Sequence, residues 1–187
     1  MTSSERFARV AALPSRDGWT TEIAIDRAGG AARAVVLSTV PPEIADDPAR
    51  LAALVADVEA AARLHHPHVV PVIGLEGLGE GLAIVEAYRP GVTLRALLEG
   101  GGRLPAEVAA RIAVDACAAL AHAAARDAGE GKGLAHGRIA PERLLVGEDG
   151  LTAVAGFGAP GPGATPAGDA AALAAVVYES ITGEPPP

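Results

Sequence analysis

Cysteine and lysine are almost absent from this sequence of 187 residues, which contains one of each, Cys117 and Lys132. A single cysteine excludes an internal disulfide framework and every metal site of the CxxC type. A single lysine excludes any chemistry that needs a lysine elsewhere in the chain. Aromatic residues make up only 3% of the chain, so we expect a core built mainly from Leu, Val, Ile and Ala.

Positive charge and long apolar runs are also scarce. The net charge is −8, whereas binding to a nucleic-acid backbone or an anionic membrane requires a cationic surface. No run approaches the roughly 18 apolar residues of a membrane-spanning helix, and the N-terminus has no basic start followed by an apolar stretch. We therefore expect a cytoplasmic protein with no membrane span, no nucleic-acid partner and no metal site.

The first half of the chain favours strands and one helix. Asp47-Pro48 is typical of a helix start, with Asp as N-cap and Pro as the first helical residue. Apolar residues then recur at three- and four-residue steps, which predicts a buried helix face that ends at His66-Pro67. The predicted strands are 20–25, 34–40, 68–75 and 82–88.

The second half favours helices. The longest helix is expected to start at Leu104-Pro105 and to continue to about Arg126. Asp169 is expected to cap a final helix that ends at Thr182. The other expected elements are a short helix near 94–98, a hairpin of 144–146 with 151–155, and an irregular segment over 159–168. This order of elements predicts the α+β class.

Several strings, in this order, resemble a bacterial serine/threonine protein kinase domain. His66-Pro67-His68-Val69-Val70 is similar to the family's His-Pro-Asn-Ile-Val, which follows its αC helix. His136-Gly-Arg-Ile-Ala-Pro-Glu-Arg143 is similar to the catalytic loop, His-Arg-Asp-Leu-Lys-Pro-Glu-Asn in the family. Ala155-Gly-Phe-Gly158 stands where the family has Asp-Phe-Gly, and the segment from Asp169 resembles the family's αF helix.

The resemblance implies a two-lobed kinase-like fold. Residues 1–88 would form a β-rich N-lobe with one αC-like helix, in which residues 1–18 are an N-terminal strand and a degenerate glycine-loop region. Residues 89–187 would form a helical C-lobe that is incomplete, because the sequence stops after the αF-like helix.

The same comparison implies that the residues of phosphoryl transfer are replaced. Catalysis in the family consists of positioning and charge stabilisation, so it needs groups that hold the triphosphate, Mg²⁺ and the acceptor hydroxyl. The degenerate positions are Val36 for the third-strand lysine, Asp57 for its αC glutamate partner, Arg138 for the acceptor-orienting aspartate, Ala140 for the loop lysine, and Arg143 and Gly156 for the two metal ligands.

Residues that support the fold are retained. The structural positions implied by the resemblance are Ala61, His136, Phe157 and Asp169, and Asp169 is expected to bond the backbone near Gly137. Residues matching the adenine-binding positions are Ala34, Val85, Glu86, Tyr88 and Leu145. With neither lysine nor metal ligands, we expect no cofactor beyond a weak binding of ATP that does not depend on Mg²⁺.

The leading hypothesis is a catalytically inactive kinase-like domain, a pseudokinase, that binds other proteins as a regulatory or scaffold module in bacterial signalling. One alternative is a divergent serine/threonine kinase that binds ATP and retains some phosphotransfer. Another is an incomplete fragment that is ordered by a partner or by self-association through the helix over Asp169–Thr182. Arg138 and Arg143 either bind a phosphate or pair with nearby carboxylates, and the sequence leaves both possibilities open.

Overall fold

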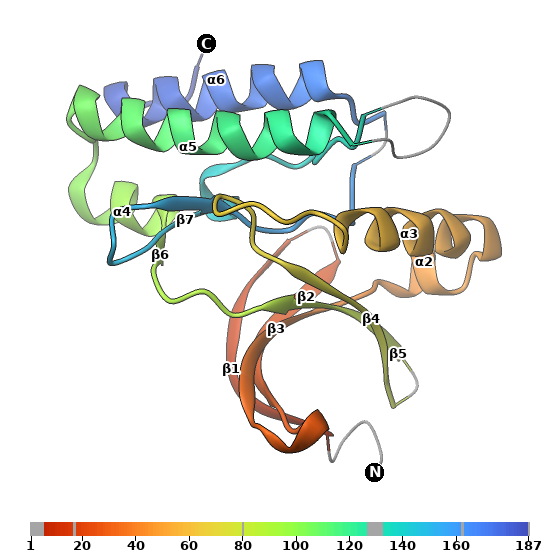
Figure 1. Ribbon diagram of the computed structural model, residues 1–187. Coiled ribbons are helices and arrows are strands. Elements are labelled where there is room, and N and C mark those ends of the chain that lie inside the picture. The colour runs from red at the N-terminus through yellow and green to blue at the C-terminus, as the bar shows by residue number, and fades with distance from the viewer. Residues whose placement is uncertain (1–5, 17, 80, 127–132, 162, 187) are drawn as a thin grey trace. The chain divides into compact units, whose positions relative to one another are not determined.

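The computed structural model describes residues 6–16, 18–79, 81–126, 133–161 and 163–186 (Figure 1). The chain forms two compact units. The first comprises residues 1–63 and 71–88, and the second comprises residues 64–70 and 89–187. The predicted lobe boundary between residues 88 and 89 assigns residues 64–70 to the first lobe, whereas these residues cluster with the second unit. The division into lobes stays a prediction.

The first unit is built on an antiparallel sheet of five strands in the order β1-β2-β3-β5-β4. The strand bounds are β1 Phe7–Arg16, β2 Trp19–Asp26, β3 Arg33–Thr39, β4 Val72–Leu78 and β5 Gly81–Ala87. One face carries the core of this unit, formed by Phe7, Ala24, Val35, Leu37, Ala83 and Val85. Inward-facing residues at every second position fit a sheet with one buried face.

Two helices complete the first unit, α2 (Pro42–Ala45) and α3 (Pro48–Ala61). The predicted start of α3 is confirmed, because the Asp47 side chain accepts hydrogen bonds from the amides of Ala49 and Arg50. The predicted end at His66-Pro67 is wrong. The chain leaves the helix after Ala61, and the Val70 N–H donates to Val154 O in the second unit's own hairpin.

The second unit combines three helices with a small sheet in the order β6-β7-β8. Helices α5 and α6 lie side by side along much of their length (Figure 1), and α5 also contacts β8. The bounds are α4 Leu94–Gly101, α5 Ala106–Ala124, α6 Pro166–Thr182, β6 Val92–Thr93, β7 Leu144–Val146 and β8 Thr152–Val154, with a 3₁₀ turn, η2, over Pro141–Arg143.

The prediction that Asp169 caps the last helix is wrong. Helix α6 begins at Pro166, and its N-cap is Thr165, whose hydroxyl oxygen accepts a hydrogen bond from the Gly168 N–H. Asp169 lies within the first turn, where its carboxylate is buried and serves another element. In the part of the chain described here, no helix combines the length and the apolar character that crossing a membrane requires.

Candidate functional site

The segment from Leu134 to Ala140 is tied to the start of α6. The Asp169 carboxylate accepts the backbone N–H of His136 at 2.6 Å and that of Gly137 at 2.7 Å. These are the hydrogen bonds that the sequence predicts near Gly137. Because Asp169 is only 3% exposed, both donors and the acceptor are shielded from water, which strengthens bonds of this charged type.

His136 is held as a neutral ring. It is fully buried, its Nε2 lies 2.9 Å from Ala155 O, and its Nδ1 accepts the Arg138 N–H at 3.1 Å. The proton therefore resides on Nε2. Burial lowers the pKa of His136 to about 4; the Ala155 hydrogen bond opposes this shift, and the charges of Arg143 and Arg138 add to it. A ring with both nitrogens engaged is a structural group and not a general base.

Phe157 packs against this ring. Its centroid lies 4.7 Å from that of His136 with the planes at 78°, an edge-to-face contact that is favourable for aromatic pairs. Phe157 is 1% exposed. The two aromatic residues thus form a buried pair in the second unit.

Gly137 lets the loop pass close to the segment before α6. Its φ is +72°, and a Cβ there would lie 2.6 Å from the Ala164 Cβ and 2.8 Å from the Gly161 N. Any larger residue would clash with backbone as well as adopt a strained φ. Arg138 follows directly and is half-buried.

Arg143 and Gly156 lie against each other. The Ala155 N–H donates to Arg143 O, which extends the β7–β8 pairing and sets Arg143 opposite the start of the next segment. A Cβ at Gly156 would lie 3.0 Å from Arg143 Nη1 and 3.3 Å from its Cζ. The guanidinium therefore occupies the space next to Gly156. Arg143 and Gly156 are the two positions that the resemblance assigns to metal ligands.

This pair does not fit Mg²⁺. The ion prefers carboxylate, carbonyl and water oxygens, and neither side chain offers one. Within the described residues, no group of three or more His, Cys, Asp and Glu side chains is placed to hold a metal ion. A cationic guanidinium at this point would instead repel a divalent cation. No step of metal-assisted phosphoryl transfer is therefore derived for this site.

The first unit holds the positions of the missing lysine and its partner. Val36 lies in β3, paired with Glu86 in β5, and Asp57 is half-buried in α3. Burial raises the pKa of Asp57. In the portions of the chain that are described, its carboxylate makes no hydrogen bond or ion pair.

The residues predicted for adenine fall in both units. Ala34, Val85, Glu86 and Tyr88 belong to the first, and Leu145 in β7 belongs to the second. Within the first unit the Tyr88 N–H donates to Ala34 O at 3.3 Å, and adenine binding at these positions stays a prediction. The remaining positions hold small side chains: Ala140, next to η2, is half-buried, and Ala61 in α3 is fully buried.

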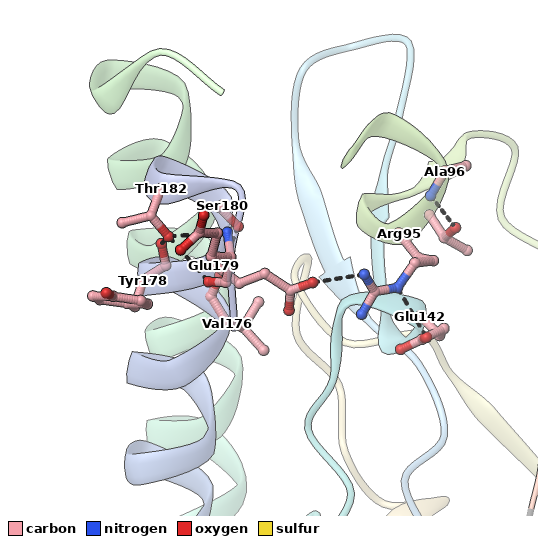
Figure 2. Close-up of polar contacts among 10 residues, drawn as sticks. Arg95, Ala96, Glu142, Val176, Tyr178, Glu179, Ser180 and Thr182 are labelled. Atoms are coloured by element: carbon pink, nitrogen blue, oxygen red, sulfur yellow. Dashed lines mark hydrogen bonds and ion pairs between the residues drawn. The ribbon is translucent and has the colours of Figure 1, made fainter. Parts of the chain in front are cut away.

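An ion-pair network surrounds Arg95, and the sequence gives no sign of it. Figure 2 shows its guanidinium between two carboxylates from different elements, Glu142 in η2 and Glu179 in α6. The Nε–Glu142 distance is 3.1 Å and the Nη1–Glu179 distance is 2.6 Å. The partners are 47 and 84 residues apart in sequence, so no local pattern reveals them. The network fixes α4 to both elements and occupies Glu142.

A cluster of histidines was also missed as a cluster, although two of its members, His66 and His68, stand out in the sequence. The His66 ring lies 5.4 Å from His68 and 5.0 Å from His122. Burial and the two neighbouring rings lower the pKa of His66. His68 contacts the buried Asp115, which also accepts the Thr152 N–H. These contacts join α5 to the β8 edge.

With this geometry described, known proteins provide the context. PknD, a serine/threonine-protein kinase of Mycobacterium tuberculosis, is 28% identical over 181 residues, which cover 82% of this chain and 26% of that protein. PknB of Mycobacterium leprae is 26% identical over 187 residues, covering 82% and 29%. A crystal structure of the PknI kinase domain of M. tuberculosis superposes with a TM-score of 0.78 at 25% identity, covering 97% of this chain and 76% of that one. The domain is serine/threonine protein kinase-like.

The kinase-like domain is a partial match to these proteins. It spans about a quarter of the length of the curated relatives with which it aligns. No protein-family model matches the chain. The predicted α+β, kinase-like fold is confirmed, because the kinase-domain structures cover nearly all of this chain.

Proposed function

We propose that this kinase-like domain is catalytically inactive and acts by binding proteins, as a regulatory or scaffold module of bacterial cytoplasmic signalling. The observation that carries the proposal is the contact of Arg143 with Gly156. Where phosphoryl transfer needs oxygen ligands for Mg²⁺, this chain has a guanidinium and a residue with no side chain.

Three further features support the same conclusion. Arg138 stands at the position of the acceptor-orienting aspartate, so a cation replaces a carboxylate. His136 is locked neutral and cannot substitute for it. Asp57 is a half-buried carboxylate without an ion-pair partner among the described residues, as expected when Val36 replaces the lysine. Meanwhile the bonds from Asp169 and the buried pair of His136 with Phe157 maintain the loop.

Protein binding is proposed through α6. Tyr178 is 44% exposed and Ile181 is 40% exposed on this helix, so two large side chains face solvent, whereas Leu173 and Val176 are buried. Exposed apolar surface of this kind favours association with another protein surface. Self-association through the same helix is the simplest form of this proposal.

The decisive experiment on activity is a phosphotransfer assay of the purified chain with radiolabelled ATP, using a generic basic protein as acceptor and Mg²⁺ or Mn²⁺ as the metal. We expect no incorporation into the chain or into the acceptor. Incorporation that disappears in a loop variant such as Arg138→Ala would overturn the proposal in favour of a divergent kinase. Incorporation that persists in that variant would be assigned to a contaminating kinase, and the assay would be repeated on material repurified until the two preparations differ or both are inactive.

A further inference from the structure

We propose that the loop carrying Arg143 and Arg138 is a binding site for a phosphate monoester that needs no metal ion. The proposal deepens the proposed function, since it assigns a ligand to the site that has lost its chemistry. It is argued from the charges of the second unit alone, and it does not depend on how the two units are placed.

Arg143 is available to a ligand. In the described segments its side chain makes no hydrogen bond or ion pair, and it is only half-buried. Its guanidinium lies beside Gly156, which has no side chain to pair with it. A guanidinium that is partly removed from water and has no acidic partner carries a desolvation cost. A bound anion would offset this cost through charge-assisted hydrogen bonds.

Three carboxylates of the second unit, Glu142, Asp149 and Asp169, are engaged by groups other than Arg143. Glu142, the sequence neighbour of Arg143, is bound by Arg95 at 3.1 Å. Asp149 lies 3.7 Å from Arg89 and accepts the Leu151 N–H, and Asp169 is buried on the backbone amides of the loop. These three carboxylates are therefore committed to other partners, whereas the Arg143 guanidinium is not.

The charges of both arginines contribute to the lowered pKa of His136. The charges of Arg143 and Arg138 both act against protonation of this buried ring, so both guanidiniums lie close enough to it to exert an electrostatic effect. Arg143, which lies against Gly156, is the principal contact that this part of the chain offers an anion.

A phosphate monoester is the ligand that this chemistry suits best. The planar guanidinium offers two parallel N–H donors that match two phosphate oxygens, and a dianion gains more from it than a carboxylate does. In active phosphoryl-transfer sites, a metal ion neutralises the phosphate oxygens. Here fixed guanidinium charge replaces that ion, so binding is expected to be the same with and without Mg²⁺.

The test measures the thermal midpoint and calorimetric affinity of the full chain with inorganic phosphate, O-phosphoserine, ATP and adenosine, each in EDTA and in Mg²⁺, at constant ionic strength. We expect the three phosphate compounds to bind in EDTA, with O-phosphoserine distinguishing a phosphorylated side chain and ATP a nucleotide as the source. Arg143→Gln should weaken the binding about tenfold or more, the loss expected for one charge-assisted contact. Arg103→Gln, which removes an exposed arginine between α4 and α5, is the matched control and should bind as the parent chain does.

The variants also separate specific binding from the general stabilisation by phosphate salts, which the two variants would share equally. Equal affinity of Arg143→Gln and Arg103→Gln overturns the proposal, as does binding that appears only with Mg²⁺, or ATP binding no tighter than that of adenosine with no binding of the other two compounds. If Arg143→Gln does not fold, Arg143→Lys keeps the charge but loses the planar fork, and unchanged affinity in it overturns the bidentate contact. Phosphotransfer in the separate radiolabel assay would remove the proposed inactivity and leave metal-free phosphate binding intact, so the two failures are distinguishable.

Discussion

Phe157 shows how one side chain can be assigned a structural role from its surroundings. Its ring is 1% exposed and meets His136 edge-on, and this side chain carries no polar atom. The ring nitrogens of the neighbouring His136 are both hydrogen-bonded, Nδ1 to the Arg138 N–H and Nε2 to Ala155 O. The residues retained from the kinase pattern in this loop therefore stabilise its conformation, while the replaced ones are Arg138, Arg143 and Gly156.

Replacing Phe157 by Ala should lower the free energy of unfolding by about 3–5 kcal/mol, because it removes a buried aromatic ring and leaves a cavity. Val114 is 63% exposed on α5, and Val114→Ala should change stability by no more than about 0.5 kcal/mol. Urea titrations of both variants measure the two values. Equal midpoints for the two variants would contradict the assigned role of Phe157.

Stability should also fall in acid through His136. Its folded-state pKa of about 4 lies below the unfolded value of about 6.5, so folding favours the neutral ring. This contribution is complete above pH 6.5 and is lost as the pH falls toward 4, by roughly 2–3 kcal/mol over that window. The lowered pKa of His66 acts in the same direction.

The measurement for this prediction is an NMR titration of the imidazole C–H signals together with urea unfolding at pH 7.5 and pH 5. The His136 signal should stay at its neutral position through pH 6. A midpoint for His136 near 6.5, or equal stability at the two pH values, would show that the ring is not held neutral.

At the scale of elements, α6 serves two purposes that its sequence predicts unequally. Its apolar character, its final residue Thr182 and the bond from Asp169 to the loop are all indicated by the sequence. Its true cap, Thr165, was missed, because a Thr-Pro start competes with an Asp three residues further on and only the backbone geometry decides between them. The ion pair of Glu179 in α6 cannot be predicted from the sequence, since its partner Arg95 is 84 residues away.

The same distinction applies to α3 and the site. Asp47-Pro48 predicts the helix start because a cap is a local interaction of neighbouring residues. The end is not local, since the segment after Ala61 is drawn into pairing with Val154. Motif positions identify Arg143 and Gly156 from the sequence, but only the structure places the guanidinium against the glycine.

The exposed face of α6 should mediate self-association. Light scattering of the purified chain at tens of micromolar should give a mass above that of a monomer, because Tyr178 and Ile181 expose apolar surface. Ile181→Asp should shift the equilibrium toward the monomer, whereas Val114→Asp, at an exposed site on α5, should leave it unchanged. A parent chain that remains monomeric at these concentrations would contradict the prediction.

At the scale of the whole molecule, the chain combines a kinase-like fold with arginines at positions where the kinase pattern has carboxylate and amide side chains. It has one lysine, in a part of the sequence outside the described residues, and its net charge is −8. Yet the loop at which a kinase gathers carboxylates and metal carries two arginines. The domain has a kinase-like fold, and its proposed role is to be recognised by other molecules.

The most direct test of this account is isothermal titration calorimetry of the chain with ATP, performed once with Mg²⁺ and once with EDTA. With neither a lysine nor a metal ligand for the triphosphate, and with the Tyr88 amide already bonded to Ala34, the dissociation constant should be weaker than about 100 μM. It should also be the same in both buffers. Micromolar binding that requires Mg²⁺ would contradict the central claim, because it would mean that this site still assembles the metal–nucleotide complex on which phosphoryl transfer depends.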